Sequence, residues 1–274
     1  MVDTELKAML THDERHWWYQ GRRRILRAAL SRLKLPGDAE LLDAGCGSGR
    51  TLDELAAFGR LTGVDVSPAA VAAARARGHR HVLVAEVERL PLGTGEFDLV
   101  TCLDVLEHTA DDGRTLRELH RVTRPGGHLL LTVPAYPSLW SYHDVANCHF
   151  RRYRRASLLH ATLAAGWTTV SITHFNAAPL APAALVRIAR RLRARSDTRS
   201  DLERTPPWLN GLLGMPSRLE SDLVRRGVPI PAGLSLLAVL RNDKPLPLRA
   251  SLSPHHNTHE RNLPWHAMPL HPAA

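Results

Sequence analysis

The sequence predicts an α/β fold in which a mostly parallel sheet carries helices on both faces. Short apolar segments alternate with helix-like segments along the first two thirds of the chain. The first apolar segment runs into a glycine-rich turn, and acidic residues end several of the others. Alternating strands and helices predict a parallel sheet, and such sheets bind ligands beyond the carboxyl ends of their strands.

Strands are expected where short apolar runs are bounded by turn residues. They fall, in order, at residues 41–44, 61–65, 81–85, 97–103, 128–133, 167–175 and 234–240. The fourth run is predominantly apolar, as a central parallel strand should be.

Helices are expected at residues 3–34, 51–58, 68–77, 111–122 and 156–165. Ser67 is a good N-cap, and Pro68 suits the first helical position. The fourth helix should end before Pro125-Gly126, and the last should end at Gly166.

A glycine-rich turn with Gly45, Gly47 and Gly49 follows the first strand. Glycine lets the backbone turn sharply and approach a ligand closely, and the next helix directs its amide dipoles at that ligand. Asp65 follows twenty positions after Gly45, at the distance typical of a carboxylate that binds ribose hydroxyls. The third glycine comes one position early for a dinucleotide fingerprint, and the lysine of a phosphate loop is missing. The pattern predicts a nucleoside-bearing cofactor.

Five segments appear in a fixed order: DAGCGSG, GVDVSP, AEVERLP, FDLVTCLDVLEHT and LRELHRVTRPGGHLLLTVPA. They resemble the motifs of class I S-adenosylmethionine-dependent methyltransferases, especially the group that includes ubiquinone and menaquinone biosynthesis enzymes. The resemblance covers residues 41–134. It implies a Rossmann-like, seven-stranded methyltransferase sheet, with S-adenosyl-L-methionine as the cofactor.

The resemblance also implies which residues bind the cofactor. The glycine turn would pass beneath the methionine part, Asp65 would hold the ribose, and Glu86 would lie near the adenine amino group. Most relatives carry aspartate at the Glu86 position, so this chain keeps the acceptor on a longer side chain. The expected cofactor contacts are Arg22, Asp43, Gly45, Cys46, Gly47, Gly49, Asp65, Val66, Glu86, Val87 and Leu103.

The methyl group of a sulfonium is already activated, so catalysis needs alignment and a deprotonated acceptor. Positioning supplies roughly 7–11 kcal/mol, and a general base adds a factor of about 10² to 10⁴. His108, after the fourth strand, is the first candidate base, with His143 and His149 as the others. A histidine that caps the next helix is the alternative for His108, and Glu107 is equally consistent with a structural role.

The segment after the fifth strand, residues 133–155, is rich in His, Tyr, Trp and Arg. Related methyltransferases carry a similar H-x-R-R-Y run at this place. The expected substrate-binding residues are Trp18, Tyr142, Asp144, Arg152 and Tyr153. A structural flap is one alternative. Zinc binding by His143, Asp144 and His149 is another, but no further ligand is apparent, and no metal site is expected.

Residues 1–35 are expected to form a helical arm with adjacent aromatics and a run of arginines. Adjacent aromatics cannot share one helix face, which favours a lid that closes the cofactor site and brings Arg22 near the cofactor carboxylate. The alternative is an amphipathic helix packed on the sheet.

The methyltransferase domain is expected over residues 36–241. A long basic insertion, about 176–231, separates the last two strands, and the tail 242–274 is expected to be disordered. Within the insertion, residues 183–195 have the pattern of an interfacial helix on anionic lipid. Packing on its own domain or on a second subunit are the alternatives, and the oligomeric state stays open.

Charge is distributed unevenly: residues 1–135 hold 18 basic and 19 acidic side chains, whereas residues 136–274 hold 18 and 8. This asymmetry indicates an anionic partner or simply good solubility. Three scattered cysteines favour a reducing compartment. With no signal peptide and no apolar run of spanning length, the expected location is cytoplasmic, with peripheral contact at the inner membrane face.

The predicted function is S-adenosylmethionine-dependent O-methylation of a small or lipid-linked acceptor of quinol or sugar type. A non-catalytic cofactor-binding scaffold is one alternative. A nucleic-acid methyltransferase is another, suggested by the basic second half. It is disfavoured because LDVLEH stands where an Asn/Asp-Pro-Pro-Tyr-type tetrapeptide is expected.

Overall fold

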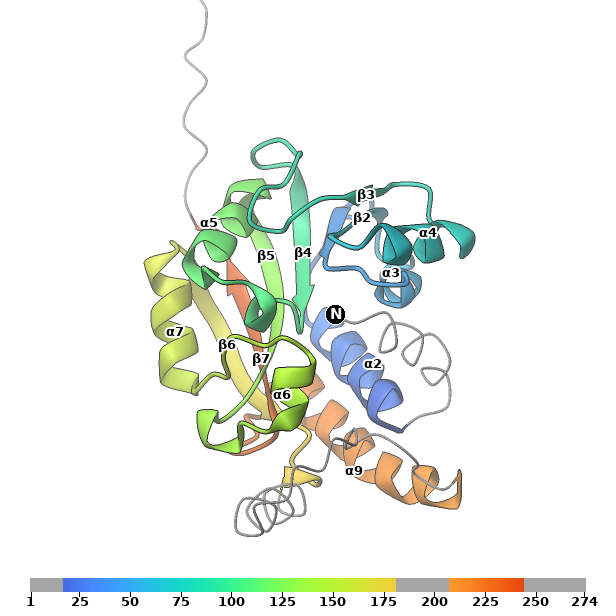
Figure 1. Cartoon of the computed structure of the whole chain (residues 1–274), viewed down its shortest axis with the longest axis vertical. Helices are drawn as coiled ribbons and strands as arrows, with labels where there is room; N and C mark the ends of the chain where they lie inside the picture. Colours follow the sequence, from blue (N-terminus) through green and yellow to red (C-terminus); the bar gives the residue numbers. More distant parts are fainter. Residues whose placement is uncertain (1–16, 181–206, 244–274) are drawn as a thin grey trace, which may run out of the picture.

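The computed structural model describes residues 17–180 and 207–243 of the chain (Figure 1). The expected interfacial helix at 183–195 and nearly all of the expected tail therefore lie outside the described residues. Among the described residues, no helix is long and apolar enough to cross a bilayer.

Seven strands form one sheet in the order β3-β2-β1-β4-β5-β7-β6. Their bounds are β1 Glu40–Ala44, β2 Arg60–Asp65, β3 Val82–Val84, β4 Phe97–Leu103, β5 Thr123–Pro134, β6 Thr168–Phe175 and β7 Ser235–Arg241. Strands β1 to β5 pair in parallel, whereas β7 runs antiparallel to both β5 and β6. The predicted methyltransferase sheet is confirmed. Its order reverses between β1 and β4, which is where such sheets bind ligands.

The described α-helices are α2 Trp17–Leu30, α3 Arg50–Leu55, α4 Pro68–Ala76, α5 Asp112–Val122, α6 Tyr142–Ala146, α7 Arg155–Ala164 and α9 Pro207–Arg226. Two short 3-10 helices, η1 Leu106–His108 and η2 Pro137–Leu139, follow β4 and β5. Helix α4 begins as predicted, since Ser67 Oγ accepts the Ala70 N–H at 3.3 Å.

Strand β5 differs most from its predicted bounds, because it begins five residues early. Thr123 already pairs with Phe97, and a register shift separates this pair from the regular ladder that starts at His128. Helix α5 therefore ends at Val122, before the Pro-Gly-Gly segment, and that segment lies within the extended strand.

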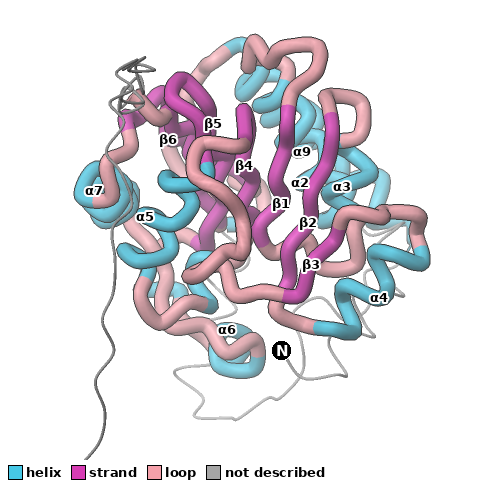
Figure 2. The backbone as a smooth tube through the Cα atoms, turned by 90° about the horizontal axis from the view of Figure 1, so that it is seen from above, coloured by secondary structure: helices cyan, strands magenta, loops and turns pink. Residues whose placement is uncertain are grey.

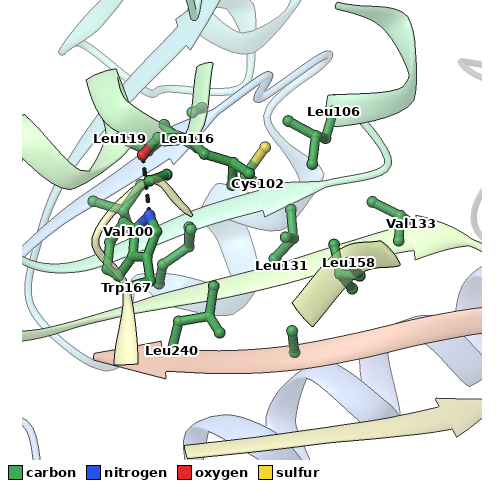
Figure 3. Packing of buried hydrophobic residues seen from close by; sticks show 14 of the residues in the cluster. Val100, Cys102, Leu106, Leu116, Leu119, Leu131, Val133, Leu158, Trp167 and Leu240 are labelled. Atoms are coloured by element: carbon green, nitrogen blue, oxygen red, sulfur yellow. Dashed lines mark hydrogen bonds between the residues drawn. The ribbon is translucent and has the colours of Figure 1, made fainter. Parts of the chain in front are cut away.

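The central strands are buried on both faces, and their side chains alternate between two cores. In β5, Leu129 and Leu131 face one core, whereas Leu130 faces the other. The first core packs against α5 and α7, where Trp167 Nε1 donates to the Leu116 carbonyl at 3.0 Å (Figure 3). The second core packs against α2 and α9 on the opposite face of the sheet (Figure 2).

Helices α2 and α9 lie side by side, although nearly two hundred residues separate them in the chain (Figure 1). Arg24 Nη1 donates to Ser217 Oγ at 3.2 Å, and Arg32 Nη1 donates to the Val224 carbonyl at 3.2 Å. Ile25 is buried in the second core. The described part of the N-terminal arm is thus a packed helix, and a lid role for the arm stays a prediction.

Candidate active site

The glycine turn after β1 adopts the left-handed conformation at Gly45, Gly47 and Gly49, with φ of 86°, 52° and 85°. A Cβ at Gly45 would collide with Val105, and one at Gly49 would come within 2.8 Å of His79 Cδ2. Nothing lies within 4 Å of a Cβ built at Gly47. Packing therefore requires two of the glycines, while Gly47 faces open space in which a ligand has room.

Asp65, the last residue of β2, holds this turn. Its Oδ2 accepts the Gly47 N–H, and its Oδ1 accepts the Ser67 N–H, both at 2.8 Å. Each carboxylate oxygen accepts two hydrogen bonds, so Asp65 keeps capacity for a hydroxyl of a ligand. The predicted ribose contact fits this geometry and stays a prediction.

Asp43 is buried at the end of β1, with 1% of its surface exposed. Thr101 Oγ1 donates to its Oδ1 at 2.6 Å, whereas Oδ2 has no hydrogen-bond partner among the described residues. Burial raises the pKa of Asp43 to about 7. A buried acceptor without a partner is costly, and a cationic group removes that cost. Together with the open space at Gly47, this unsatisfied carboxylate fits the ammonium-bearing part of S-adenosylmethionine.

Arg22 of α2 forms an ion pair with Asp104, directly after β4. Asp104 has a positive φ of 55°, and its Oδ1 accepts from Thr132 Oγ1 at 3.1 Å. The ion pair joins the N-terminal helix to the ligand-binding edge of the sheet. Arg22 is thus placed at that edge, where its predicted contact with the cofactor carboxylate stays a prediction.

The other predicted cofactor residues lie along the same edge. Cys46 is buried, and burial raises the pKa of its thiol, so it packs rather than reacts. Val66 is 66% exposed just after β2, and Glu86 is exposed after β3. A hollow of about 280 Å³ lined by Leu52, Gly59 and His81 lies toward the opposite edge, and no predicted site residue lines it.

The loop after β5 is organised around Asp144, which is completely buried. Its Oδ1 accepts from Arg152 Nε at 2.6 Å and lies 3.0 Å from His149 Nδ1, while its Oδ2 accepts the Ser141 N–H at 2.8 Å. Burial alone would raise the pKa of Asp144, but the hydrogen bonds from His149 and Arg152 hold it below its usual value. Arg152 Nη1 also donates to the Ala135 carbonyl at 3.1 Å.

Most of the predicted substrate-binding residues are engaged inside this loop. Asp144 and Arg152 pair with each other, and the buried Tyr153 donates its hydroxyl to Asp112 Oδ2 at 2.9 Å. Tyr142, by contrast, is 51% exposed. The side chains of Trp18 and His143 lie outside the described part of the chain.

Glu107, His108 and His149 form a cluster beyond the end of β4. The two imidazole rings are 4.6 Å apart and nearly perpendicular, and the Phe150 N–H donates to the Glu107 carbonyl at 2.7 Å. Burial, and then the neighbouring His149, lower the pKa of His108 to about 4. Burial, and then the Asp104 carboxylate, raise the pKa of Glu107 well above its usual value. Two candidate bases, His108 and His149, are thus brought together.

This sheet, with its glycine turn and an acidic residue ending the neighbouring strand, defines an S-adenosylmethionine-dependent methyltransferase fold of class I. Residues 42–131 of the sequence match the protein family described as the methyltransferase domain. That segment is a class I S-adenosylmethionine-dependent methyltransferase domain, and S-adenosylmethionine is the cofactor of this family. The family implies a small-molecule methyl acceptor in general terms.

A ubiquinone biosynthesis O-methyltransferase of Xanthomonas oryzae pv. oryzae is 38% identical over 110 residues, which cover 38% of this chain and 46% of the relative. The chain spans less than half the length of the curated relatives it matches. The relationship to these enzymes is therefore distant.

Two solved structures show the same fold. One is a chain from the complex between the Haloferax volcanii Trm112 methyltransferase activator and a methyltransferase, with a TM-score of 0.58, 23% identity and coverage of 88% of this chain and 95% of that one. The other is geranyl diphosphate C-methyltransferase from Streptomyces coelicolor A3(2), in complex with Mg²⁺, geranyl diphosphate and S-adenosyl-L-homocysteine. Its TM-score is 0.52 at 19% identity, with coverage of 79% and 78%.

Proposed function

We propose that this protein transfers a methyl group from S-adenosylmethionine to a hydroxyl oxygen of a small or lipid-linked acceptor of quinol or sugar type. The observation that carries the proposal is the placement of the glycine turn and the Glu107–His108–His149 cluster at the ends of the adjacent strands β1 and β4. Cofactor and acceptor groups therefore meet at the point where the sheet order reverses.

On the cofactor side, S-adenosylmethionine supplies a methyl group already activated by a positive sulfur. Asp65 and Glu86 bind the nucleoside, and Asp43 accepts from the ammonium group. Arg22, which pairs with Asp104 in this structure, binds the carboxylate in this proposal. These contacts fix the direction of the methyl group, and positioning of this kind lowers a barrier by roughly 7–11 kcal/mol.

On the acceptor side, we assign His149 as the group that takes the hydroxyl proton. Asp144 holds one ring nitrogen of His149, which orients the ring as a carboxylate orients a general base. The hydroxyl proton passes to the imidazole of His149, and the electron pair of the oxygen forms the bond to the methyl carbon. The sulfur–methyl bond breaks at the same time, its electron pair stays on sulfur, and S-adenosylhomocysteine leaves. Burial lowers the pKa of His108 to about 4, so this histidine is neutral and has little affinity for a proton.

The surface around the loop favours an acceptor with an apolar part. Tyr142 is 51% exposed, and Val145 and Phe150 are each 58% exposed. Exposed apolar side chains on one short loop commonly contact a ligand or a membrane. We extend the proposal to peripheral contact with an anionic inner membrane face, for which residues 183–195 provide the basic amphipathic pattern.

Calorimetric titration with S-adenosylmethionine, S-adenosylhomocysteine and NAD tests the cofactor side. We expect saturable binding of the first two and none of NAD; binding of NAD alone would end the methyltransferase assignment. Transfer of labelled methyl from S-adenosylmethionine into hydroxylated lipids, quinols and sugars then tests the acceptor. Cofactor binding without transfer to any acceptor class would favour the scaffold alternative.

Sedimentation with liposomes tests the membrane contact separately. Anionic liposomes should retain the protein at low salt and release it as the salt concentration rises, because screening weakens surface charge attraction. Neutral liposomes are the control. No co-sedimentation at low salt would refute the interfacial helix without touching the enzymatic proposal.

A further inference from the structure

The cluster beyond β4 has the composition and spacing of a metal site. Glu107, His108 and His149 each offer one ligand atom, and these atoms lie within 4.8 Å of one another. Within residues 17–180 and 207–243, this is the one group of three such residues brought so close. Two imidazoles and one carboxylate are a ligand set of catalytic zinc sites.

One of the two histidines, His149, is oriented by a buried carboxylate. His149 Nδ1 lies 3.0 Å from Asp144 Oδ1, and Asp144 is itself fixed by the buried Arg152. Histidines that bind metals nearly always engage the second ring nitrogen with a carboxylate or a backbone carbonyl. Asp144 gives His149 a partner of this kind.

Glu107 supplies an independent observation. Only 1% of its surface is exposed, and its Oε2 has no hydrogen-bond partner among the described residues. An ionisable group this deeply buried normally has a partner, and a cation is the partner that satisfies a carboxylate beside two imidazoles.

We propose that Glu107, His108 and His149 form a binding site for a divalent transition-metal cation, with Zn²⁺ as the best fit. Ligands about 2.0–2.2 Å from a tetrahedral zinc are roughly 3.4 Å apart, so small side-chain rotations bring the three atoms into range. Three protein ligands leave a fourth position open for water or an acceptor oxygen.

This inference rests on the proposed function for its catalytic meaning. An acceptor hydroxyl bound at the open position loses its proton more easily, because the cation stabilises the oxyanion. The proton passes to solvent, and the oxyanion forms a bond to the methyl carbon while the sulfur–methyl bond breaks and S-adenosylhomocysteine leaves. The two histidines act as ligands in this scheme, and this role replaces that of His149 as the general base.

Zinc titration by calorimetry tests the site in the full chain. The tail histidines His255, His256 and His259 are replaced by alanine in every sample, so that they cannot contribute binding. We expect one equivalent of Zn²⁺ to bind, with affinity at least about 100-fold lower in Glu107→Gln and in His149→Ala. His160→Ala, which removes an exposed histidine on α7, is the matched control and should bind as the parent does.

Thermal unfolding and S-adenosylmethionine binding establish that each variant is folded. If one of the two site variants does not fold, the other alone tests the site. Parental zinc affinity in both would overturn the site, as would a parent protein without saturable zinc binding. A parent that binds S-adenosylmethionine but not zinc refutes the metal site alone. A parent that binds zinc but not S-adenosylmethionine refutes the methyltransferase proposal alone.

Discussion

The glycine turn after β1 and the loop after β5 lie at the same edge of the sheet, but they are held in place by different forces. The turn relies on its backbone: three left-handed glycines and the Gly47 N–H, which donates to Asp65. The loop relies on side chains, above all the buried ion pair between Asp144 and Arg152. The turn therefore tolerates little change in shape, whereas the loop tolerates little change in charge.

Removal of one buried charge should produce the largest effect. Asp144→Ala leaves the Arg152 guanidinium buried without its carboxylate, and breaking a buried pair in this way costs about 3–5 kcal/mol. Denaturant unfolding measures the loss. Asp222→Ala, which removes a solvent-exposed partner of Arg225, is the control and should cost under about 1 kcal/mol. Equal costs for the two variants would mean that the loop does not depend on its buried charges.

The next largest effect is expected on turnover, which should distinguish the loop after β5 from the glycine turn. His149→Ala should lower kcat about 100-fold and leave the Kd for S-adenosylmethionine unchanged, because the ring lies on the acceptor side. His108→Ala should also lower kcat and leave this Kd unchanged. Single-turnover methyl transfer together with calorimetry measures both quantities. If neither substitution slows methyl transfer, the acceptor is activated elsewhere.

Stability against pH probes the cofactor side through Asp43. A carboxyl whose pKa is raised on folding stabilises the protein at low pH, and this contribution is lost as the pH rises from about 4 through about 7. The cofactor-free protein should therefore lose several degrees of melting temperature between pH 5 and pH 8 that the Asp43→Asn variant does not lose. Identical pH profiles would show that Asp43 ionises freely and has no need of a cationic ligand.

The cofactor side was largely predictable because its determinants are local in the sequence. Glycine spacing, the acidic residue twenty positions later and the Ser-Pro helix start all act over short distances. Strand and helix alternation predicts the parallel sheet, whereas its seven-stranded form was implied by the resemblance to methyltransferases. The acceptor side was predictable only in its residue types. Nothing in a run of His, Arg and Tyr says that Tyr153 reaches Asp112 on α5, or that Arg152 turns inward to Asp144.

Glu107 is a second case in which the sequence predicts the type of residue but not its tertiary contacts. It stands beside a candidate base in the sequence and was equally consistent with a structural role, because burial and the approach of His149 depend on tertiary packing. The adjacent Glu-His pair after a central strand was the available signal. Without the position of residue 149, that signal did not distinguish a helix cap from a ligand set.

A smaller effect is expected on cofactor affinity, which tests the glycine turn after β1. Asp65→Ala removes the acceptor of two N–H groups as well as the predicted ribose contact, so the Kd for S-adenosylmethionine should rise at least about tenfold. Asp38→Ala, in an exposed position before β1 at the other end of the strand, should leave the Kd unchanged. An unchanged Kd in Asp65→Ala would remove this residue from the cofactor site.

The smallest effect on stability is expected at the contact that joins the two regions to the N-terminal helix. The Arg22–Asp104 pair is about one quarter exposed on each side, and pairs of this kind contribute under about 1 kcal/mol. Arg22→Ala should therefore unfold almost as the parent does but bind S-adenosylmethionine more weakly, if Arg22 exchanges Asp104 for the cofactor carboxylate. Arg27→Ala, which removes another ion pair of α2, is the matched control and should not change the Kd. If Arg22→Ala binds S-adenosylmethionine with the affinity of the parent, Arg22 only holds α2 against β4 and does not belong to the cofactor site.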